Sequence, residues 1–259
     1  MAATYLDKIL AWHRERAAAD VRDLDELIEL ASRCAPTRGF RAALATGPNL
    51  AVIAEIKRRS PSKGDLCADL DAAELARAYE AGGASCLSVL TDEVHFAGSV
   101  GDLVTARAAT SLPVLRKDFT VSVADVCDAR LMGADGVLLI AAALHDQLLI
   151  DCLATARMVG IDALVEVHDE VELTRALDLG ADLIGVNQRD LITFTVDQER
   201  AVRMAGLFPD DVVSVAESGV RDRRDATVLR DAGYDAVLVG ESLVTSNDPA
   251  AAVTDLIVS

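Results

Sequence analysis

Residues 133–141, GADGVLLIA, contain the pattern that decides the fold: a glycine that can end a helix, followed at once by a short apolar run of strand length. The same transition into an apolar run recurs at Gly83-Ala84-Ser85, Gly180-Ala181-Asp182 and Gly233-Tyr234-Asp235. Successive copies lie 50, 47 and 53 residues apart, close to the length of two strand–helix units. The repeat therefore predicts four pairs of such units.

Eight apolar runs of strand length, most of them rich in β-branched residues, alternate with amphipathic segments of helix length. The runs are residues 50–56, 85–90, 112–116, 135–141, 162–167, 182–187, 212–216 and 235–239. This alternation is typical of the α/β class, and eight units in four pairs favour a closed (β/α)8 TIM barrel. An open, doubly wound sheet of eight parallel strands is the alternative.

The first 46 residues show helical spacing without a strand. Leu24, Leu27 and Ile28 repeat at helical intervals, and a short helix is expected from Arg38 to Ala45, ended by Gly47-Pro48. We therefore expect residues 1–46 to form an N-terminal helical extension packed on a catalytic barrel of residues 47–259.

Several polar residues are expected to cap the barrel helices. Asp71 and Asp169 each precede a glutamate by three residues, as in a capping box. Ser122 and Asn247 are candidate N-caps, and Pro249 follows early in the last helix.

The composition excludes several classes of protein. With 51% hydrophobic and only 3% aromatic residues, the core must be aliphatic, and a formal net charge of −17 disfavours nucleic-acid or anionic-membrane partners. Because this net negative charge repels phosphate, a site for a phosphorylated substrate would need local positive charge. The five cysteines form no CxxC pair, and neither an export leader nor an apolar run of about 18 residues is present. We expect a cytoplasmic monomer or weak homodimer without a cofactor.

No metal is expected, because His13, His95 and His145 show no metal-ligand spacing with cysteines or carboxylates.

The active site of such a barrel lies at the carboxyl ends of its strands, so the polar residues there are the candidates. Only four of the 25 basic residues are lysines, and three of them, Lys57, Lys63 and Lys117, lie at or just after predicted strand ends. Period-two alternation places Glu55 with Lys57, and Phe119 with Lys117, on inward faces. An apolar ring beside Lys117 is expected to lower the pKa of that ammonium. A structural ion pair and a solvated loop lysine are the structural alternatives.

Glu166 stands between two valines, where a lone inward carboxylate is expected to have a raised pKa suited to acid–base work. His168 reads as the start of the next turn. Asn187 faces inward, and the planar fork of Arg189 can bind a substrate carboxylate. A satisfied core carboxylate and a capping turn remain the alternatives.

Two short glycine-containing segments are candidates for binding phosphate through backbone N–H groups: Ser218-Gly219 after the seventh strand and Gly240-Glu241 after the eighth. The basic loop 58–64 after the first strand is either a mobile lid that meets an anion or a solvated turn. Together with Lys57, Lys117 and Arg189, it would concentrate positive charge at one mouth of the barrel.

Six segments in order resemble the signature segments of the indole-3-glycerol phosphate synthase family. They are AEIKRRSPSKG (54–64), PVLRKDF (113–119), ALVEVH (163–168), IGVNQRDL (184–191), AESGV (216–220) and VLVGESLV (237–244). The resemblance implies a lyase that closes the ring of 1-(2-carboxyphenylamino)-1-deoxyribulose 5-phosphate, releases CO2 and then dehydrates. Gln188 and Glu241 depart from the residues commoner in that family.

The resemblance also implies roles for the site residues. Lys117 would be the general acid of ring closure, and Glu166 and Lys57 the acid–base pair of dehydration, in an order left open. The other groups would bind hydroxyls and the intermediate (Glu55, Asn187, Glu217), the ring (Phe119), the carboxylate (Ser60, Arg189) and, with Lys57, the phosphate (Ser218, Gly219, Gly240, Glu241).

Two other functions would use the same residues. A Schiff-base aldolase also needs a strand-borne lysine with a lowered pKa. A non-catalytic barrel that only binds a phosphate ligand is the third hypothesis.

Overall fold

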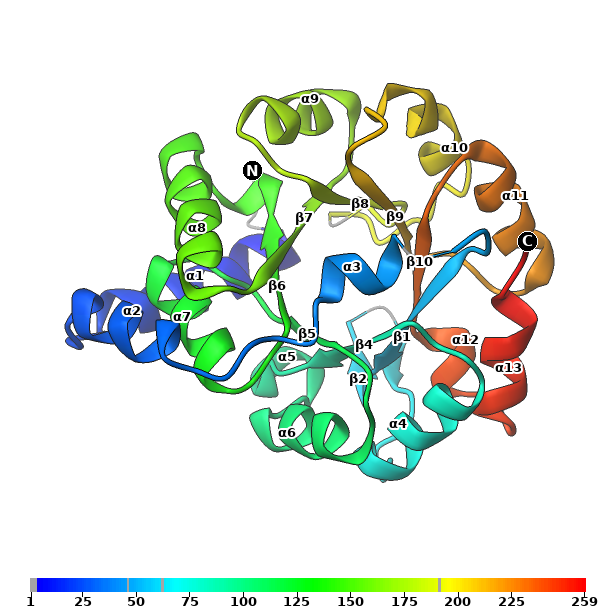
Figure 1. The fold of residues 1–259 in the computed structure, drawn as a ribbon, viewed down its shortest axis with the longest axis horizontal. Helices are drawn as coiled ribbons and strands as arrows, with labels where there is room; N and C mark the ends of the chain where they lie inside the picture. The colour runs from blue at the N-terminus through cyan, green and yellow to red at the C-terminus, as the bar shows by residue number, and fades with distance from the viewer. Residues whose placement is uncertain (1–3, 46, 62, 191) are drawn as a thin grey trace.

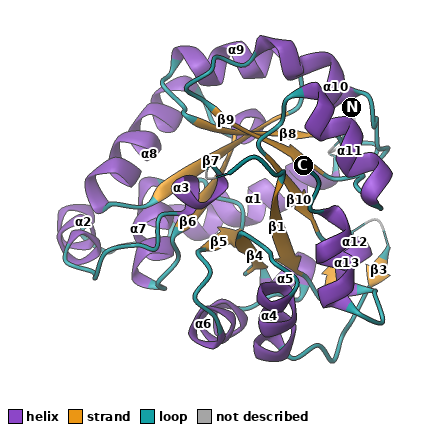
Figure 2. Ribbon diagram, turned by 45° about the vertical axis from the view of Figure 1, so that its right-hand side comes forward, coloured by secondary structure: helices purple, strands orange, loops and turns teal. Residues whose placement is uncertain are grey.

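The structure is a computed structural model that describes residues 4–45, 47–61, 63–190 and 192–259. Its centre is a closed barrel of eight parallel strands, in which each strand pairs with its neighbours in chain order and the first pairs with the last (Figures 1 and 2). The strands are β1 (Ala51–Ile56), β4 (Cys86–Leu90), β5 (Val114–Lys117), β6 (Gly136–Ile140), β7 (Asp162–Val167), β8 (Leu183–Asn187), β9 (Val213–Glu217) and β10 (Ala236–Val239). The TIM-barrel prediction is confirmed, and the open sheet is excluded.

A ring of helices surrounds the barrel (Figure 2). Its members are α4 (Ala72–Ala81), α6 (Val100–Ala109), α7 (Val123–Leu131), α8 (Asp146–Val159), α9 (Glu170–Asp178), α10 (Arg200–Met204), α11 (Arg223–Ala232) and α13 (Pro249–Leu256). Short helices α5 (Glu93–Phe96) and α12 (Glu241–Val244) and the 3-10 turns Ala141–Ala143 and Ala205–Leu207 follow strand or helix ends. No helix within the described ranges has both the length and the apolar character needed to cross a membrane.

The helix caps follow the sequence with two corrections. The reciprocal bonds of the capping boxes expected at Asp71 and Asp169 do not form among the described residues, and Glu172 instead accepts the N–H of His168. Asp71, Ser122 and Asp169 each accept a backbone N–H of the first turn, as expected. The last helix is capped by Asp248 rather than Asn247, and its side chain accepts the N–H of Ala251. Because Pro249 is the first helical residue, the cap must be the residue directly before it.

The N-terminal region consists of α1 (Tyr5–Ala18), α2 (Leu24–Ser32) and α3 (Phe40–Leu44). Helix α2 packs against α7 and α8, and α3 covers the amino-terminal end of the barrel, in front of the strands in Figure 1. Phe40 is fully buried there, against Gly136 at the start of β6. Thr46, where the expected boundary between extension and barrel falls, lies outside the described residues.

Helix α1 lies at the opposite end, beside the carboxyl ends of the strands. Arg14 donates to the carbonyl of Ala143, just past β6, and the ring of Tyr5 stands edge-on to Phe194 in the loop after β8. The first helix therefore borders the end of the barrel at which the candidate residues gather.

Candidate active site

One cavity of about 570 Å3 opens at the carboxyl ends of the strands, and every candidate residue from the sequence lines it. These residues are Glu55, Lys57, Ser60, Lys117, Phe119, Glu166, Asn187, Arg189, Glu217, Ser218, Gly219, Gly240 and Glu241. The strands supply them because alternate residues point inward and parallel strands end at one rim.

The centre of the cavity is a lysine between two carboxylates. Lys117 Nζ lies 2.8 Å from Glu166 Oε2 and 3.2 Å from Glu217 Oε2. Burial by itself lowers the pKa of Lys117, but Glu166, Glu217 and the nearby Glu55 outweigh it and raise that pKa above its ordinary value. The expected lowering of this pKa is wrong, since carboxylates from other strands dominate over the ring of Phe119. Lys117 is therefore an ammonium that holds its proton.

Glu166 is surrounded by donors and cations. Its Oε1 accepts a 3.0 Å hydrogen bond from Asn187 Nδ2 and lies 3.5 Å from His168 Nε2. Burial favours a raised pKa for Glu166, but the Lys117 ammonium and the His168 ring outweigh it and hold that pKa well below the usual range. The sequence-based expectation of a raised pKa is thus wrong, because Glu166 is not a lone carboxylate.

His168 begins the turn before α9, as expected, but its ring also belongs to the site. Its Nδ1 lies 3.1 Å from Glu172 Oε2, while Nε2 faces Glu166. Burial lowers the pKa of His168, yet the two carboxylates raise it to about 9. The ring is therefore a second cation beside Glu166, which its place in the sequence did not indicate.

Glu217 is the carboxyl group whose pKa is raised. Burial and the neighbouring Glu166 together outweigh the opposing effect of Lys117 and raise the pKa of Glu217 to about 7. The side chain fits because β8 carries Gly185 beside it, where a Cβ would clash with Glu217 Oε1. Oε1 is buried and has no hydrogen-bond partner among the described residues. Glu217 thus supplies the proton-holding carboxyl group that was expected of Glu166.

A second lysine lies at the end of β1. Lys57 Nζ is paired with Glu55 Oε2, and both face Gly240 at the end of β10. A Cβ at position 240 would clash with Glu55 and press on Lys57, so glycine is needed where the two strand ends meet.

The backbone around Lys57 offers unpaired donors. The N–H groups of Ser218, Gly219 and Gly240 make no hydrogen bond within the described residues. Ser218 has a left-handed backbone, with φ at 66°, which is uncommon for a non-glycine residue and typical of functional turns. Gln188 Nε2 holds this turn by donating 2.8 Å to the carbonyl of Ser218. Free amides beside an ammonium are suited to a phosphate.

Aromatic side chains also line the cavity. Phe119, after β5, lies with its ring centroid 6.1 Å from that of Phe96 in α5, and both line the cavity. Arg189 also lines it, held by a bond from its Nη1 to the carbonyl of Phe194. Phe96 and Phe194 were not singled out from the sequence, because neither lies in a strand whose alternation would orient its side chain.

The basic loop after β1 is a small hairpin of β2 (Arg59–Ser60) and β3 (Gly64–Asp65). Ser62, within the expected lid, lies outside the described residues. Arg58 pairs with Asp102 and Arg59 with Asp65, so neither guanidinium lines the cavity. The expectation that both arginines add positive charge at the mouth is therefore wrong.

Lys63 is the cation of this loop that lines the cavity, 3.5 Å from Glu241 Oε1. The described lining carries five basic side chains (Lys57, Lys63, Lys117, Arg189, Arg221) and five acidic ones (Glu55, Asp118, Glu166, Glu217, Glu241). The cavity is thus close to balanced in charge, in contrast to the −17 of the whole chain.

Solved structures of low sequence identity share the fold. A 3-hexulose-6-phosphate synthase from Salmonella typhimurium matches with a TM-score of 0.62 and 14% identity, over 80% of this chain and 96% of that one. A thiamine phosphate pyrophosphorylase from Pyrococcus furiosus matches with a TM-score of 0.60 and 18% identity, over 80% and 93%. At these identities the likeness concerns the barrel alone.

Sequence relatives are much closer. A Streptomyces coelicolor protein named indole-3-glycerol phosphate synthase 2 is 53% identical over 232 residues, 90% of each chain. An indole-3-glycerol phosphate synthase from Mycolicibacterium vanbaalenii is 51% identical over 258 residues, 98% of this chain and 94% of the relative. The family model described as indole-3-glycerol phosphate synthase matches residues 6–256. By both measures, this chain belongs to the indole-3-glycerol phosphate synthase family.

Proposed function

We propose that the chain is a carboxy-lyase of tryptophan biosynthesis that converts 1-(2-carboxyphenylamino)-1-deoxyribulose 5-phosphate into indole-3-glycerol phosphate, CO2 and water. The observation that carries the proposal is the Lys117 ammonium, held between Glu166 and Glu217 in a cavity lined by aromatic rings and by residues with free amides. The proposed setting is the cytoplasm, which fits five cysteines that are all free. We take residues 47–259 as the catalytic barrel and residues 1–46 as its extension.

The lining of the cavity matches both ends of this substrate. The anthranilate ring lies against Phe119, and its carboxylate faces Arg189 and Ser60. The phosphate meets the N–H groups of Ser218-Gly219 and Gly240-Glu241 and the ammonium of Lys57. The sugar hydroxyls and the intermediate are bound by Glu55, Asn187 and Glu217.

Ring closure needs an acid at the ribulose carbonyl. Lys117 donates its proton to the carbonyl oxygen while the ring carbon that bears the carboxylate attacks the carbonyl carbon. The new C–C bond breaks the aromaticity of the ring. The carboxylate then leaves as CO2, and its C–C bond electrons restore the aromatic system. A lysine whose pKa is raised suits this role because it is protonated when the substrate binds.

Dehydration needs one acid and one base. The hydroxyl formed at the former carbonyl leaves as water after taking a proton, and a base removes the proton that lets the ring double bond form. Glu166 is ionised in the free enzyme, between Lys117 and His168, so we assign it the base. Lys57, paired with Glu55, is then the donor.

The test is the fluorescence of indole-3-glycerol phosphate formed from this substrate by the wild-type chain, Lys117→Met and Lys117→Arg. We expect turnover by the wild type and a loss of at least about 10²-fold in both variants, since arginine keeps the charge but does not release the proton. Circular dichroism checks that the variants fold. Near-normal turnover by folded Lys117→Met would reject the assignment.

The Schiff-base aldolase is disfavoured by the same lysine. A nucleophilic amine must be unprotonated, whereas the pKa of Lys117 is raised by its carboxylates. Borohydride reduction in the presence of a ketose phosphate decides the point: we expect no covalent adduct, and an adduct on Lys117 or Lys57 would favour the aldolase.

A further inference from the structure

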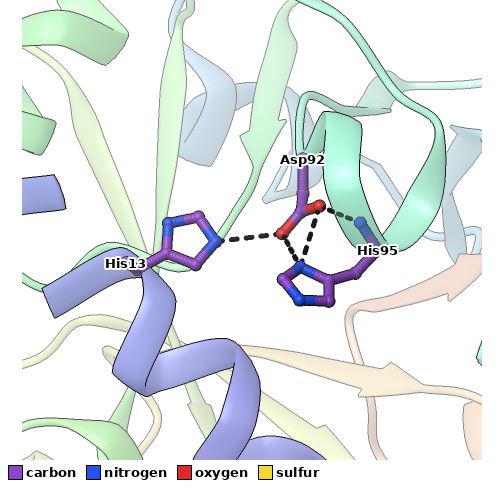
Figure 3. A group of neighbouring side chains, drawn as sticks. All are labelled: His13, Asp92 and His95. Atoms are coloured by element: carbon purple, nitrogen blue, oxygen red, sulfur yellow. Dashed lines mark hydrogen bonds and ion pairs between the residues drawn. The ribbon is translucent and has the colours of Figure 1, made fainter. Parts of the chain in front are cut away.

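Three side chains capable of binding a metal meet beside the cavity, where α1 contacts the segment after β4 (Figure 3). His13 projects from α1, Asp92 follows β4, and His95 lies in α5. His13 Nε2 and His95 Nδ1 each lie 2.9 Å from the same oxygen, Asp92 Oδ2. From the sequence we expected no metal-ligand set for these histidines, because 79 residues separate His13 from Asp92; the fold brings them together.

The carboxylate at the centre of this cluster lacks a fixed positive partner. Asp92 is only 2% exposed, and within the described residues its ion pairs are with the two imidazoles and with no lysine or arginine. Its other oxygen, Oδ1, accepts the backbone N–H of His95 at 2.6 Å. Asp118 Oδ1 adds further negative charge 3.7 Å from His13 Nε2, although Arg116 pairs with that carboxylate. A buried anion between imidazoles favours a cation.

The donor set is that of a transition-metal site. Two imidazole nitrogens and one carboxylate oxygen are typical ligands of Zn²⁺ and related divalent ions. The three donor atoms lie within 4.8 Å of one another. Ligands about 2.1 Å from a tetrahedral zinc lie roughly 3.4 Å apart, so binding needs only small rotations of the side chains.

Two features of the cluster favour binding of an ion. His13 Nδ1 has no hydrogen-bond partner among the described residues, so no second bond fixes that ring. The His95 side chain is 15% exposed, so one ring of the cluster reaches solvent. None of the three residues lines the cavity, so the cluster is separate from the proposed active site.

We propose that His13, Asp92 and His95 bind one divalent transition-metal ion of the zinc class, with solvent completing its coordination. The ion ties α1 to the carboxyl end of the barrel. It would act on stability and on the position of the neighbouring rings: His95 precedes Phe96, and the ring centroid of His13 lies 5.5 Å from that of Phe119. The proposal does not depend on the proposed activity.

The test is titration of the metal-free, full-length chain without a histidine tag, with Zn²⁺ by calorimetry and with Co²⁺ by visible absorption. The variants are His13→Gln and His95→Asn, because Gln places a donor near Nε2 and Asn near Nδ1 but both amides bind metal poorly. The matched control is His145→Asn, an exposed cap of α8 that Asn can replace.

We expect one Zn²⁺ per chain in the wild type and in His145→Asn, and affinity at least about 10-fold weaker in both cluster variants. Zn²⁺ should also raise the unfolding temperature of the wild type but not of His95→Asn. Absence of stoichiometric binding, or equal binding by all four proteins, would overturn the proposal. If His13→Gln does not fold, His95→Asn, at the more exposed ring, decides the result alone.

Discussion

The two ends of the barrel both bury carboxylates, but they satisfy them differently. At the amino-terminal end, Asp135 is fully buried and accepts four hydrogen bonds, from the backbone N–H groups of Arg38 and Val114 and twice from the Arg107 guanidinium. At the carboxyl end, Glu166 and Glu217 share one lysine, and Glu217 keeps an unpartnered oxygen among the described residues.

The contrast separates stability from activity. A carboxylate with every lone pair occupied by fixed donors holds α3 and the strand starts together and has no free capacity for chemistry. Carboxyl groups that compete for one ammonium around a cavity have displaced pKa values and can exchange protons. Substitutions at the two ends should therefore affect different measurements.

The largest effect is expected from Glu166→Gln at the carboxyl end. Loss of the proposed base should lower kcat by about 10²–10⁴-fold, while stability changes little because Lys117 keeps Glu217 as its partner. Steady-state fluorescence kinetics and a denaturant unfolding curve measure the two quantities. A kcat within tenfold of wild type would remove Glu166 from the reaction.

Asp135→Asn should do the opposite at the amino-terminal end. An amide cannot accept from all four donors and leaves Arg107 without its counter-charge, so the free energy of unfolding should fall by about 3 kcal/mol. The kcat per folded molecule should stay close to wild type. A stable Asp135→Asn protein with reduced kcat would erase the distinction between the two ends.

Glu217→Gln should change how stability depends on pH. The pKa of Glu217 is raised on folding to about 7, so its contribution to stability is present at low pH and is lost as pH rises towards and through 7. A glutamine side chain does not titrate. Between pH 4.5 and pH 8, the free energy of unfolding of the variant should therefore rise relative to that of the wild type by up to about 3 kcal/mol. Unfolding free energies measured across that range check the slope; parallel curves would contradict the raised pKa.

An effect no larger than that of Glu217→Gln, but in the alkaline range, is expected from His168→Asn, because the titrating group is a base. Folding raises the pKa of His168 to about 9, so its stabilising contribution is complete below about pH 6.5 and disappears as pH rises through 9. The variant should lack this alkaline loss in the free energy of unfolding, which amounts to about 3 kcal/mol at most. His145→Asn is the control, and an identical alkaline slope in His168→Asn and wild type would show that the ring is not charged.

The sequence predicts the scaffold well because its signals are local. Glycine followed by an apolar run marks the starts of four of the eight barrel strands, and period-two alternation places Glu55, Lys57 and Lys117 inward. All of these lie on the cavity. The prediction of Asn247 as a cap is wrong because Pro249 begins the helix, which makes Asp248 the cap.

What the sequence could not give are charges that meet across the barrel. Glu166 and Glu217 lie 49 and 100 residues from Lys117, and their contacts with it reverse the pKa shifts expected for Lys117 and Glu166. The Arg58 side chain was assigned to the mouth because its partner, Asp102, lies 44 residues further on. The cluster of His13, Asp92 and His95 was missed for the same reason.

The most direct test of the central claim follows the carboxyl carbon. The wild-type chain is given substrate labelled in the anthranilate carboxylate, and labelled CO2 and fluorescent product are measured together. Ring closure and decarboxylation in one cavity predict one CO2 for each indole-3-glycerol phosphate formed. A folded chain that binds the substrate but releases no CO2, or a product that retains the label, would contradict it.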